Sequence, residues 1–190
     1  MIEDTDYRTP RGLDRALFQK LATCEWIRAS QHLVIGGPTG IGKSWLACAL
    51  GHKACREGWS VLYRRASRLF AELATARGEG RLSRFLATLE RTRLLIIDDW
   101  GPEPLTAEQR RDLLEIVDDR YEKGSLLITS QIPIGRWHEV IGDHTIGDAI
   151  LDRVIHRAHR LELKGPSMRK RHNAEVSAAA NTGLTNAKEK

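Results

Sequence analysis

The glycine-rich segment at residues 36–44 carries the clearest chemical pattern in the chain. It reads Gly-Gly-Pro-Thr-Gly-Ile-Gly-Lys-Ser, follows the apolar run 33–35, and matches G-x-x-x-x-G-K-[ST]. Glycines let consecutive backbone N–H groups turn inward, and the helix that follows adds the positive end of its dipole. A polyphosphate fits such a loop, with Lys43 on the β and γ oxygens and the Ser44 hydroxyl on a bridging Mg²⁺. A chance glycine-rich turn is the alternative. The residues expected to bind a nucleoside triphosphate are Gly37, Pro38, Thr39, Gly40, Ile41, Gly42, Lys43 and Ser44.

Two neighbouring acids end a second apolar run, at residues 94–97. Ligands collect at the carboxyl ends of parallel strands, so Asp98 is expected in the Mg²⁺ shell beside the glycine-rich loop. Asp99 is expected to polarise an attacking water. Together they have the form of a Walker B motif. In the alternative interpretation, both acids only cap the following turn.

Polar side chains that could act on the γ-phosphate follow further along the chain. The run 126–129 ends in Thr-Ser-Gln, where Gln131, and after it Thr129, could orient the attacking water, although polar residues also favour ordinary strand exits. Arg153 and Arg157 lie one helical turn apart and could reach the nucleotide of a neighbouring subunit. An internal salt bridge to Asp152 or Glu162 is the alternative for these arginines.

Five apolar segments alternate with helical stretches and predict a parallel sheet. They cover residues 32–35, 60–63, 94–98, 126–129 and 159–163. Three are almost continuously apolar and are expected at the centre of the sheet, covered on both faces. The last one alternates between apolar and polar residues, which is typical of an edge strand.

Caps and spacing predict the helices. Thr106 and Gln109 form a capping box, and the following helix is expected to close at Gly124. The stretch 65–90 is expected to be two helices broken at Gly78 and Gly80. Residues 13–27 are expected to form one helix. The cysteines at positions 48 and 55 share a helix face, which we interpret as the face packed on the sheet. Residues 174–190 lack an apolar face and are expected to be disordered.

The composition is that of a globular protein with one domain. Of the 190 residues, 41% are apolar and 29% charged, and no apolar run approaches a membrane span. No signal peptide opens the chain, so a cytoplasmic protein without membrane contact is expected. Three cysteines without close spacing indicate neither a disulfide framework nor a zinc site. The net charge of +5 and the clustered arginines favour polyanionic partners or, equally, a solvated basic surface.

These motifs together resemble one known family. The segments GGPTGIGKSWLACALGHKACREG, LLIIDDWGPEPLTAEQRRDLLEIVDDRY, LLITSQIPIGRWHEVIGD, AILDRVIHRAHRLELKG and SMRKR are similar to the insertion-sequence helper ATPases called IstB, relatives of the DnaC helicase loaders within the AAA+ class. The resemblance covers residues 4–171. Asp-Asp-Trp-Gly at 98–101, Ile-Thr-Ser-Gln at 128–131 and Ser-Met-Arg-Lys at 167–170 are its most specific parts.

The resemblance implies an α/β fold of the P-loop NTPase (AAA+) type. This fold is a three-layer sandwich with a central five-stranded parallel sheet and no C-terminal lid domain. The implied divisions are an N-terminal linker and helix at 1–30, the ATPase core at 31–165, and a basic segment with a disordered tail at 166–190. Lys43 and Ser44 correspond to Walker A, Asp98 and Asp99 to Walker B, Thr129 to Gln131 to the first sensor region, and Arg153 or Arg157 to the arginine finger.

The resemblance also implies function. It suggests ATP and Mg²⁺ as cofactors, DNA-stimulated ATP hydrolysis, ATP-dependent homo-oligomers, and sequence-independent DNA binding in which Arg77, Arg81 and Arg84 contact phosphates. It suggests the transposase of the same element as the partner, provided that the helical segment that family members carry ahead of the matching part is not essential. A DnaC-like loader in DNA replication, or an inactive remnant that only binds ATP, are the alternatives.

Overall fold

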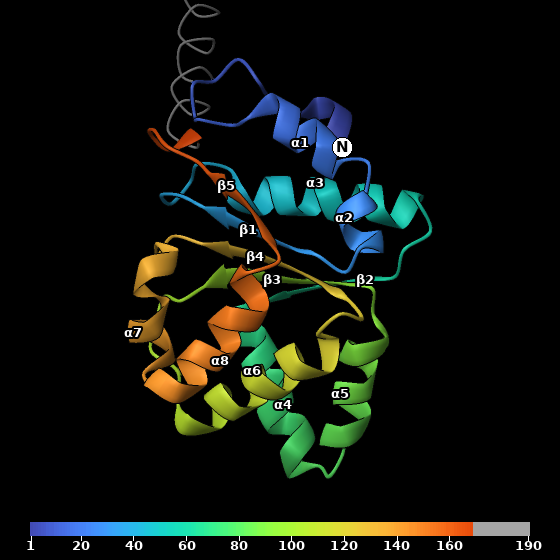
Figure 1. The fold of residues 1–190 in the computed structure, drawn as a ribbon, viewed down its shortest axis with the longest axis vertical. Coiled ribbons are helices and arrows are strands. Elements are labelled where there is room, and N and C mark those ends of the chain that lie inside the picture. The colour runs from blue at the N-terminus through green and yellow to red at the C-terminus, as the bar shows by residue number, and fades with distance from the viewer. Residues whose placement is uncertain (169–190) are drawn as a thin grey trace, which may run out of the picture.

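A single five-stranded sheet organises the chain. The computed structural model describes residues 1–168, so the expected basic cluster at 169–171 and the expected disordered tail lie outside the described residues. The strands are β1 (His32–Gly36), β2 (Val61–Arg65), β3 (Leu94–Trp100), β4 (Ser125–Ser130) and β5 (Ala158–Glu162). Their order is β2-β3-β4-β1-β5, and all neighbouring pairs are parallel (Figure 1). The predicted parallel sheet is confirmed. The carboxyl ends of its strands lie together on one side, which we call the carboxyl edge of the sheet.

The central strands are the three that the apolar runs predicted. Every residue of β1 and β4 is buried, and in β3 only Asp99 is exposed. Such strands can be apolar on both faces because helices cover both faces of the sheet. β5 lies at one edge, as its alternating pattern predicted, and the half-buried β2 forms the other edge.

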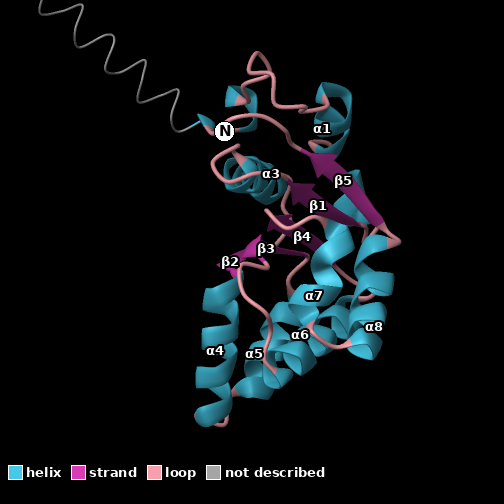
Figure 2. Ribbon diagram, turned by 90° about the vertical axis from the view of Figure 1, so that its left-hand side faces the viewer, coloured by secondary structure: helices cyan, strands magenta, loops and turns pink. Residues whose placement is uncertain are grey.

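Helices form the two outer layers (Figures 1 and 2). One face carries α3 (Lys43–Arg56), with the short α1 (Arg15–Leu21), α2 (Glu25–Arg28) and the 3-10 helix η1 (Ile2–Asp4) beyond it. The other face carries α4 (Ala66–Gly78), α5 (Leu82–Arg91), α6 (Ala107–Arg120), the 3-10 helix η2 (Ile134–Arg136), α7 (Trp137–Ile141) and α8 (His144–Ile155). Each layer has its own apolar cluster against the sheet. The result is the expected three-layer sandwich.

Local signals account for several helix boundaries. The Thr106 hydroxyl accepts a hydrogen bond from the Gln109 N–H, and the Gln109 side chain accepts one from the Thr106 N–H, so the predicted capping box begins α6. The long crossover between β2 and β3 is two helices, α4 and α5, separated where Gly80 has a φ of 67°. Both predictions are confirmed.

Two expectations for the first layer are wrong. Residues 13–27 form two short helices because Cys24, with a φ of 61°, interrupts the helical backbone between them. Cys48 and Cys55 do share one face of α3, but both are exposed. The face packed on the sheet carries smaller or more apolar side chains, namely Leu46, Ala47, Leu50, Gly51 and Ala54. The spacing fixed a common face but not which face was buried.

Candidate functional site

The glycine-rich loop connects the end of β1 to the start of α3, as predicted. Gly37, Gly40 and Gly42 have φ values of 143°, 79° and 97°, which favour glycine. A Cβ at Gly37 would also lie 2.6 Å from the Leu163 carbonyl oxygen. The loop therefore needs its glycines both for its backbone conformation and for the close approach of the segment after β5.

Lys43 lies at the first position of α3, with its ammonium group folded over the loop. Its Nζ donates to the carbonyl oxygens of Gly37 at 2.7 Å and Pro38 at 3.0 Å. Burial lowers the pKa of Lys43, while the charges of Asp99 and Asp98 oppose that effect. The ammonium group is thus enclosed by the loop and faces the two acids, which is the position from which it could contact loop-bound phosphates.

The two acids occupy a β-bulge. In the pairing of β3 with β4, Ile97 lies opposite Ile128 and Trp100 opposite Ser130, so Asp98 and Asp99 together face a single residue, Thr129. Asp99 has a φ of 59° and an exposed side chain, whereas Asp98 is 2% exposed. Bulges of this kind often lie next to active sites because they redirect a side chain. Here the bulge places one acid in the sheet and the other in solvent.

The Thr129 hydroxyl stabilises the bulge. It donates to Asp98 Oδ1 at 2.5 Å and accepts the Asp99 N–H at 2.9 Å, so it satisfies a backbone donor that the irregular pairing leaves free. Next to it, the Gln131 side-chain oxygen accepts a hydrogen bond from the Thr39 hydroxyl of the glycine-rich loop. The structure therefore brings the loop, the acid pair, Thr129 and Gln131 together at the carboxyl edge of the sheet.

The oxygen donors at this edge fit a magnesium ion. Mg²⁺ is usually held by one or two carboxylates together with waters and substrate phosphates. The exposed Ser44 hydroxyl on α3 and the Asp98 carboxylate could supply the protein ligands. Among residues 1–168 there is no cluster of three or more His, Cys, Asp or Glu side chains that could hold a metal without such a substrate.

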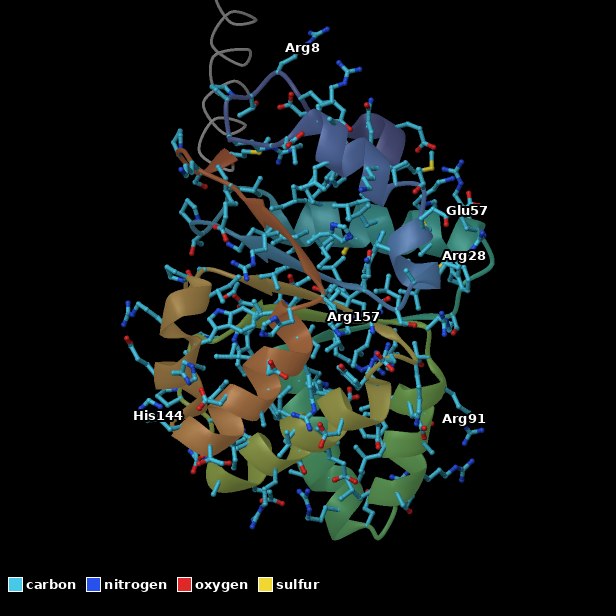
Figure 3. All side chains as sticks on the ribbon, in the orientation of Figure 1. Arg8, Arg28, Glu57, Arg91, His144 and Arg157 are labelled. Carbon is cyan, nitrogen blue, oxygen red and sulfur yellow. The ribbon has the colours of Figure 1, made fainter. Side chains whose placement is uncertain are left out.

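The two candidate finger arginines lie far from the glycine-rich loop, at the edge of the sheet formed by the amino ends of the strands. The Arg157 carbonyl accepts the N–H of His32, which begins β1, whereas the glycine-rich loop follows the end of the same strand. Figure 3 shows Arg157 at this amino edge. Its guanidinium pairs with Glu122 at 2.9 Å, and Arg153 pairs with Asp118. Internal salt bridges exist, as the alternative predicted, but with other partners than the two acids named from the sequence. Any finger role would have to be toward another subunit.

The three arginines predicted to contact DNA do not form one surface. Arg77 on α4 pairs with Glu108 and the buried Asp112, both from α6. Arg81 and Arg84 instead line a groove between α4 and α5. Arg81 pairs with Glu79 in that groove, and Arg84 is exposed. The other groove-lining residues include Arg68, Thr75, Phe85 and Thr88.

Two residues at the site were missed from the sequence. The hydroxyl of Tyr63, the middle residue of β2, donates to Asp98 Oδ2 at 2.7 Å, and burial together with this carboxylate raises the pKa of Tyr63 to about 12. Tyr63 is the last residue of the segment 60–63 that the sequence predicted as a strand, and a hydroxyl at that position was a signal that could have found it. Arg11 contacts the glycine-rich loop from the N-terminal segment, and no local pattern marks it.

The strand order, the loop between β1 and α3 and the acid pair ending β3 define a P-loop NTPase of the AAA+ class. The crystal structure of DnaI has a TM-score of 0.73 at 19% identity, covering 85% of this chain and 89% of that one. The crystal structure of the DnaC helicase loader has a TM-score of 0.67 at 20% identity, covering 78% and 87%. Identities this low show the fold alone.

The chain belongs to the family described as IstB-like ATP binding protein, which matches residues 1–176. It is 61% identical to a protein of Sinorhizobium fredii (strain NBRC 101917 / NGR234) named as an insertion sequence ATP-binding protein, y4pL, over 88% of this chain and 69% of that protein. It is 38% identical to the protein of Pseudomonas aeruginosa named for insertion sequence IS21, over 88% of this chain and 63% of that protein. No helix within residues 1–168 has the length and apolar character needed to cross a membrane.

Proposed function

We propose that the chain binds and hydrolyses ATP and serves as the helper ATPase of an insertion sequence, assembling on DNA and assisting the transposase. One observation supports the ATPase part: the glycine-rich loop with Lys43, the acid pair in the β-bulge and Gln131 lie together at the carboxyl edge of the sheet. The insertion-sequence part is supported by the names of the relatives.

The geometry suggests a role for each side chain. Loop N–H groups and the Lys43 ammonium bind the phosphates, and the exposed Asp99 carboxylate orients the water that attacks the γ-phosphate. Gln131 would sense that phosphate, a role supported by its hydrogen bond to Thr39 of the loop. A bound Mg²⁺ would neutralise charge on the phosphate oxygens. Arg153 or Arg157 would act on the nucleotide of a neighbouring copy. In their own chain both lie at the amino ends of the strands, away from the glycine-rich loop.

The ATPase assignment is tested by two substitutions with different expected effects. Lys43→Ala should weaken Mg-ATP binding by about a hundredfold, because it removes a charge-assisted phosphate contact. Asp99→Asn should leave binding nearly unchanged but lower turnover by about a hundredfold, because it removes the group that polarises water. Calorimetry measures the binding, and phosphate release measures the turnover.

Two exposed positions provide matched controls, Lys123→Ala and Asp152→Asn, which should behave like the wild type. The ATPase proposal fails if Lys43→Ala binds Mg-ATP normally, or if Asp99→Asn turns it over at the wild-type rate.

The DNA part of the proposal rests on the groove between α4 and α5. Arg84 forms no ion pair with the described residues and provides a cation there, whereas Arg81 pairs with Glu79 and Arg68 with Glu72. The half-buried Phe85 provides an aromatic surface. Arg77 is left out because two acids of α6 neutralise it. Binding through phosphate contacts should show little sequence preference and a steep salt dependence.

A helicase loader is the second candidate, supported by the similarity of fold to DnaC and DnaI. The two candidates differ in the client protein. An integrase-like reading frame beside the gene would favour transposition. So would a strand-transfer assay in which this chain stimulates the protein encoded by that reading frame. DNA-stimulated ATP hydrolysis by the purified chain would exclude an inactive remnant.

A further inference from the structure

Arg11 is a buried arginine that touches the glycine-rich loop from outside. Its side chain is 2% exposed. Nη1 donates to the Ile41 carbonyl oxygen at 3.1 Å and to Met168 Sδ at 3.2 Å, and Nη2 donates to the Asp6 carbonyl oxygen at 3.0 Å. A Cβ on Gly42 would lie 2.5 Å from Nη1, so the guanidinium is packed directly on the loop backbone.

Three segments that are far apart in the sequence meet around this side chain, at residues 6–12, 36–42 and 163–168. The Lys164 N–H donates to the Arg11 carbonyl at 2.8 Å, and the Leu163 N–H donates to the Gly36 carbonyl at 2.9 Å. The Met168 N–H donates to the Gly40 carbonyl at 2.9 Å. The N-terminal segment and the segment after β5 therefore form a bracket, defined here as residues 6–12 and 163–168, around the outer side of the loop.

The bond from Arg11 to the Ile41 carbonyl orients a peptide unit of the loop. In a trans peptide the C=O and the following N–H point in opposite directions, and no cis peptide bond occurs within residues 1–168. Holding the Ile41 carbonyl outward therefore turns the Gly42 N–H inward, toward the side where the phosphates are proposed to bind. A charged donor on the carbonyl also polarises the peptide group.

The charge of Arg11 has no anionic partner in the described part of the chain. All its hydrogen-bond partners there are neutral, and its buried Nε has none. Burial lowers the pKa of Arg11, and the nearby charges of Asp6 and Tyr7 oppose that effect. An unpaired buried cation is costly, and an anion bound on the other side of the loop would offset part of this cost.

We propose that Arg11 is a positioning residue for phosphate binding. It orients the Ile41–Gly42 peptide and couples phosphate binding in the loop to the packing of the bracket against the loop. This inference rests on the proposed nucleotide binding and adds to it a residue from outside the core. The coupling is reciprocal, so a bound triphosphate should also stabilise the bracket.

The experiment compares the full chain with Arg11→Met and Arg11→Lys, using Arg8→Met as the control. Arg8 lies on the same segment, is exposed, and points away from the molecule in Figure 3. Calorimetry with Mg-ATP and with tripolyphosphate, which has no base, gives the affinities well below the melting temperature. We expect Arg11→Met to weaken both ligands by about tenfold or more, Arg11→Lys to be intermediate, and Arg8→Met to match the wild type.

Hydrogen exchange supplies a readout that a purely structural brace would not change. In the wild type, Mg-ATP should slow exchange in both halves of the bracket, and in the Arg11 variants this protection should be reduced. If Arg11→Met does not fold, the affinities of Arg11→Lys and the hydrogen exchange of the wild type still test the proposal.

The inference is overturned if the wild type binds Mg-ATP while an Arg11 variant binds tripolyphosphate with unchanged affinity, or if the bracket gains no protection on binding. A loss confined to Mg-ATP would overturn it as well, because it would show that Arg11 acts on the binding of the adenosine part of ATP and not on that of the phosphates. Absence of any Mg-ATP binding by the wild type would instead refute the proposed function.

Discussion

The Asp98 carboxylate is held from two sides by hydroxyl groups of neighbouring strands. Thr129 of β4 donates to one oxygen and Tyr63 of β2 to the other, and the residue is 2% exposed. Groups that hydrogen-bond a metal ligand fix its orientation and tune its affinity for the metal. Tyr63 is therefore a positioning residue for the proposed Mg²⁺ site.

Replacing Tyr63 by Phe should raise the Mg²⁺ concentration needed for half-maximal ATP hydrolysis by about tenfold, because Asp98 loses one of its two hydroxyl donors. Titrating Mg²⁺ at saturating ATP measures this change. Tyr121→Phe, at a side chain that is 43% exposed, is the control. An unchanged Mg²⁺ requirement in Tyr63→Phe would show that the hydroxyl has no part in positioning the acid.

Residues with a local pattern were predictable, and residues that act across the fold were not. Lys43 and Asp98 were found because their neighbours in the sequence are diagnostic, and the structure places both at one edge of the sheet. Tyr63 and Arg11 contact the site only after β2 and the N-terminal segment have packed beside it. The roles proposed for the predicted residues stay predictions.

At the scale of elements, α4 and α5 separate arginines that look equivalent in the sequence. Arg77 faces α6 and pairs with the buried Asp112, whereas Arg84, on α5, faces the groove between the two helices. The first is part of the packing of α4 on α6. The second is available to a polyanion such as DNA.

Arg84→Ala should weaken DNA binding and lower the salt-dependence slope by about 1, as expected for one lost phosphate contact. Arg77→Ala should leave that slope unchanged but lower the melting temperature, because it removes the counter-ion of a buried carboxylate. Fluorescence anisotropy over a salt series and thermal denaturation provide the two measurements. The opposite pattern would contradict this assignment, and a wild type that binds no DNA would refute the DNA proposal itself.

Local sequence patterns predicted most elements and missed those set by tertiary packing. The apolar runs gave the five strands, and the capping box gave the start of α6, because both signals lie within a few residues. The break at Cys24 and the exposure of Cys48 depend on how the first layer packs on the sheet. The bulge at the acid pair arises from the pairing of β3 with β4, which no single segment reveals.

For the molecule as a whole, His32 links stability to pH. It is 2% exposed, and its Nδ1 accepts the Leu126 N–H at 3.0 Å, which requires an unprotonated nitrogen. Burial, reinforced by the charges of Arg120 and Arg157, lowers the pKa of His32 from 6.5 to about 4. Between these two values the unfolded chain binds a proton that the folded chain does not, so stability falls as the pH falls.

The free energy of unfolding should therefore decrease by about 3 kcal/mol on account of His32 as the pH is lowered from 6.5 to about 4. His32→Gln, whose amide oxygen can still accept the Leu126 N–H, should show a decrease smaller by about this amount. Urea unfolding across the pH range measures it. His144→Gln, at an exposed residue labelled in Figure 3, should keep the wild-type dependence. Equal slopes in His32→Gln and the wild type would exclude His32 as the source.

The bulge in β3 has a consequence on the other side of the sheet. Leu95 and Ile97 point into the layer of α4 to α8, and strict alternation would turn residue 100 toward α3. The additional residue at the acid pair reverses this parity. Trp100 therefore joins Leu95 and Ile97, with its ring centroid 5.6 Å from that of Trp137 on α7. The bulge thus sets both the directions of the two acids and the packing of Trp100 against Trp137. A change that removed the extra residue would therefore disturb the candidate site and the apolar core together.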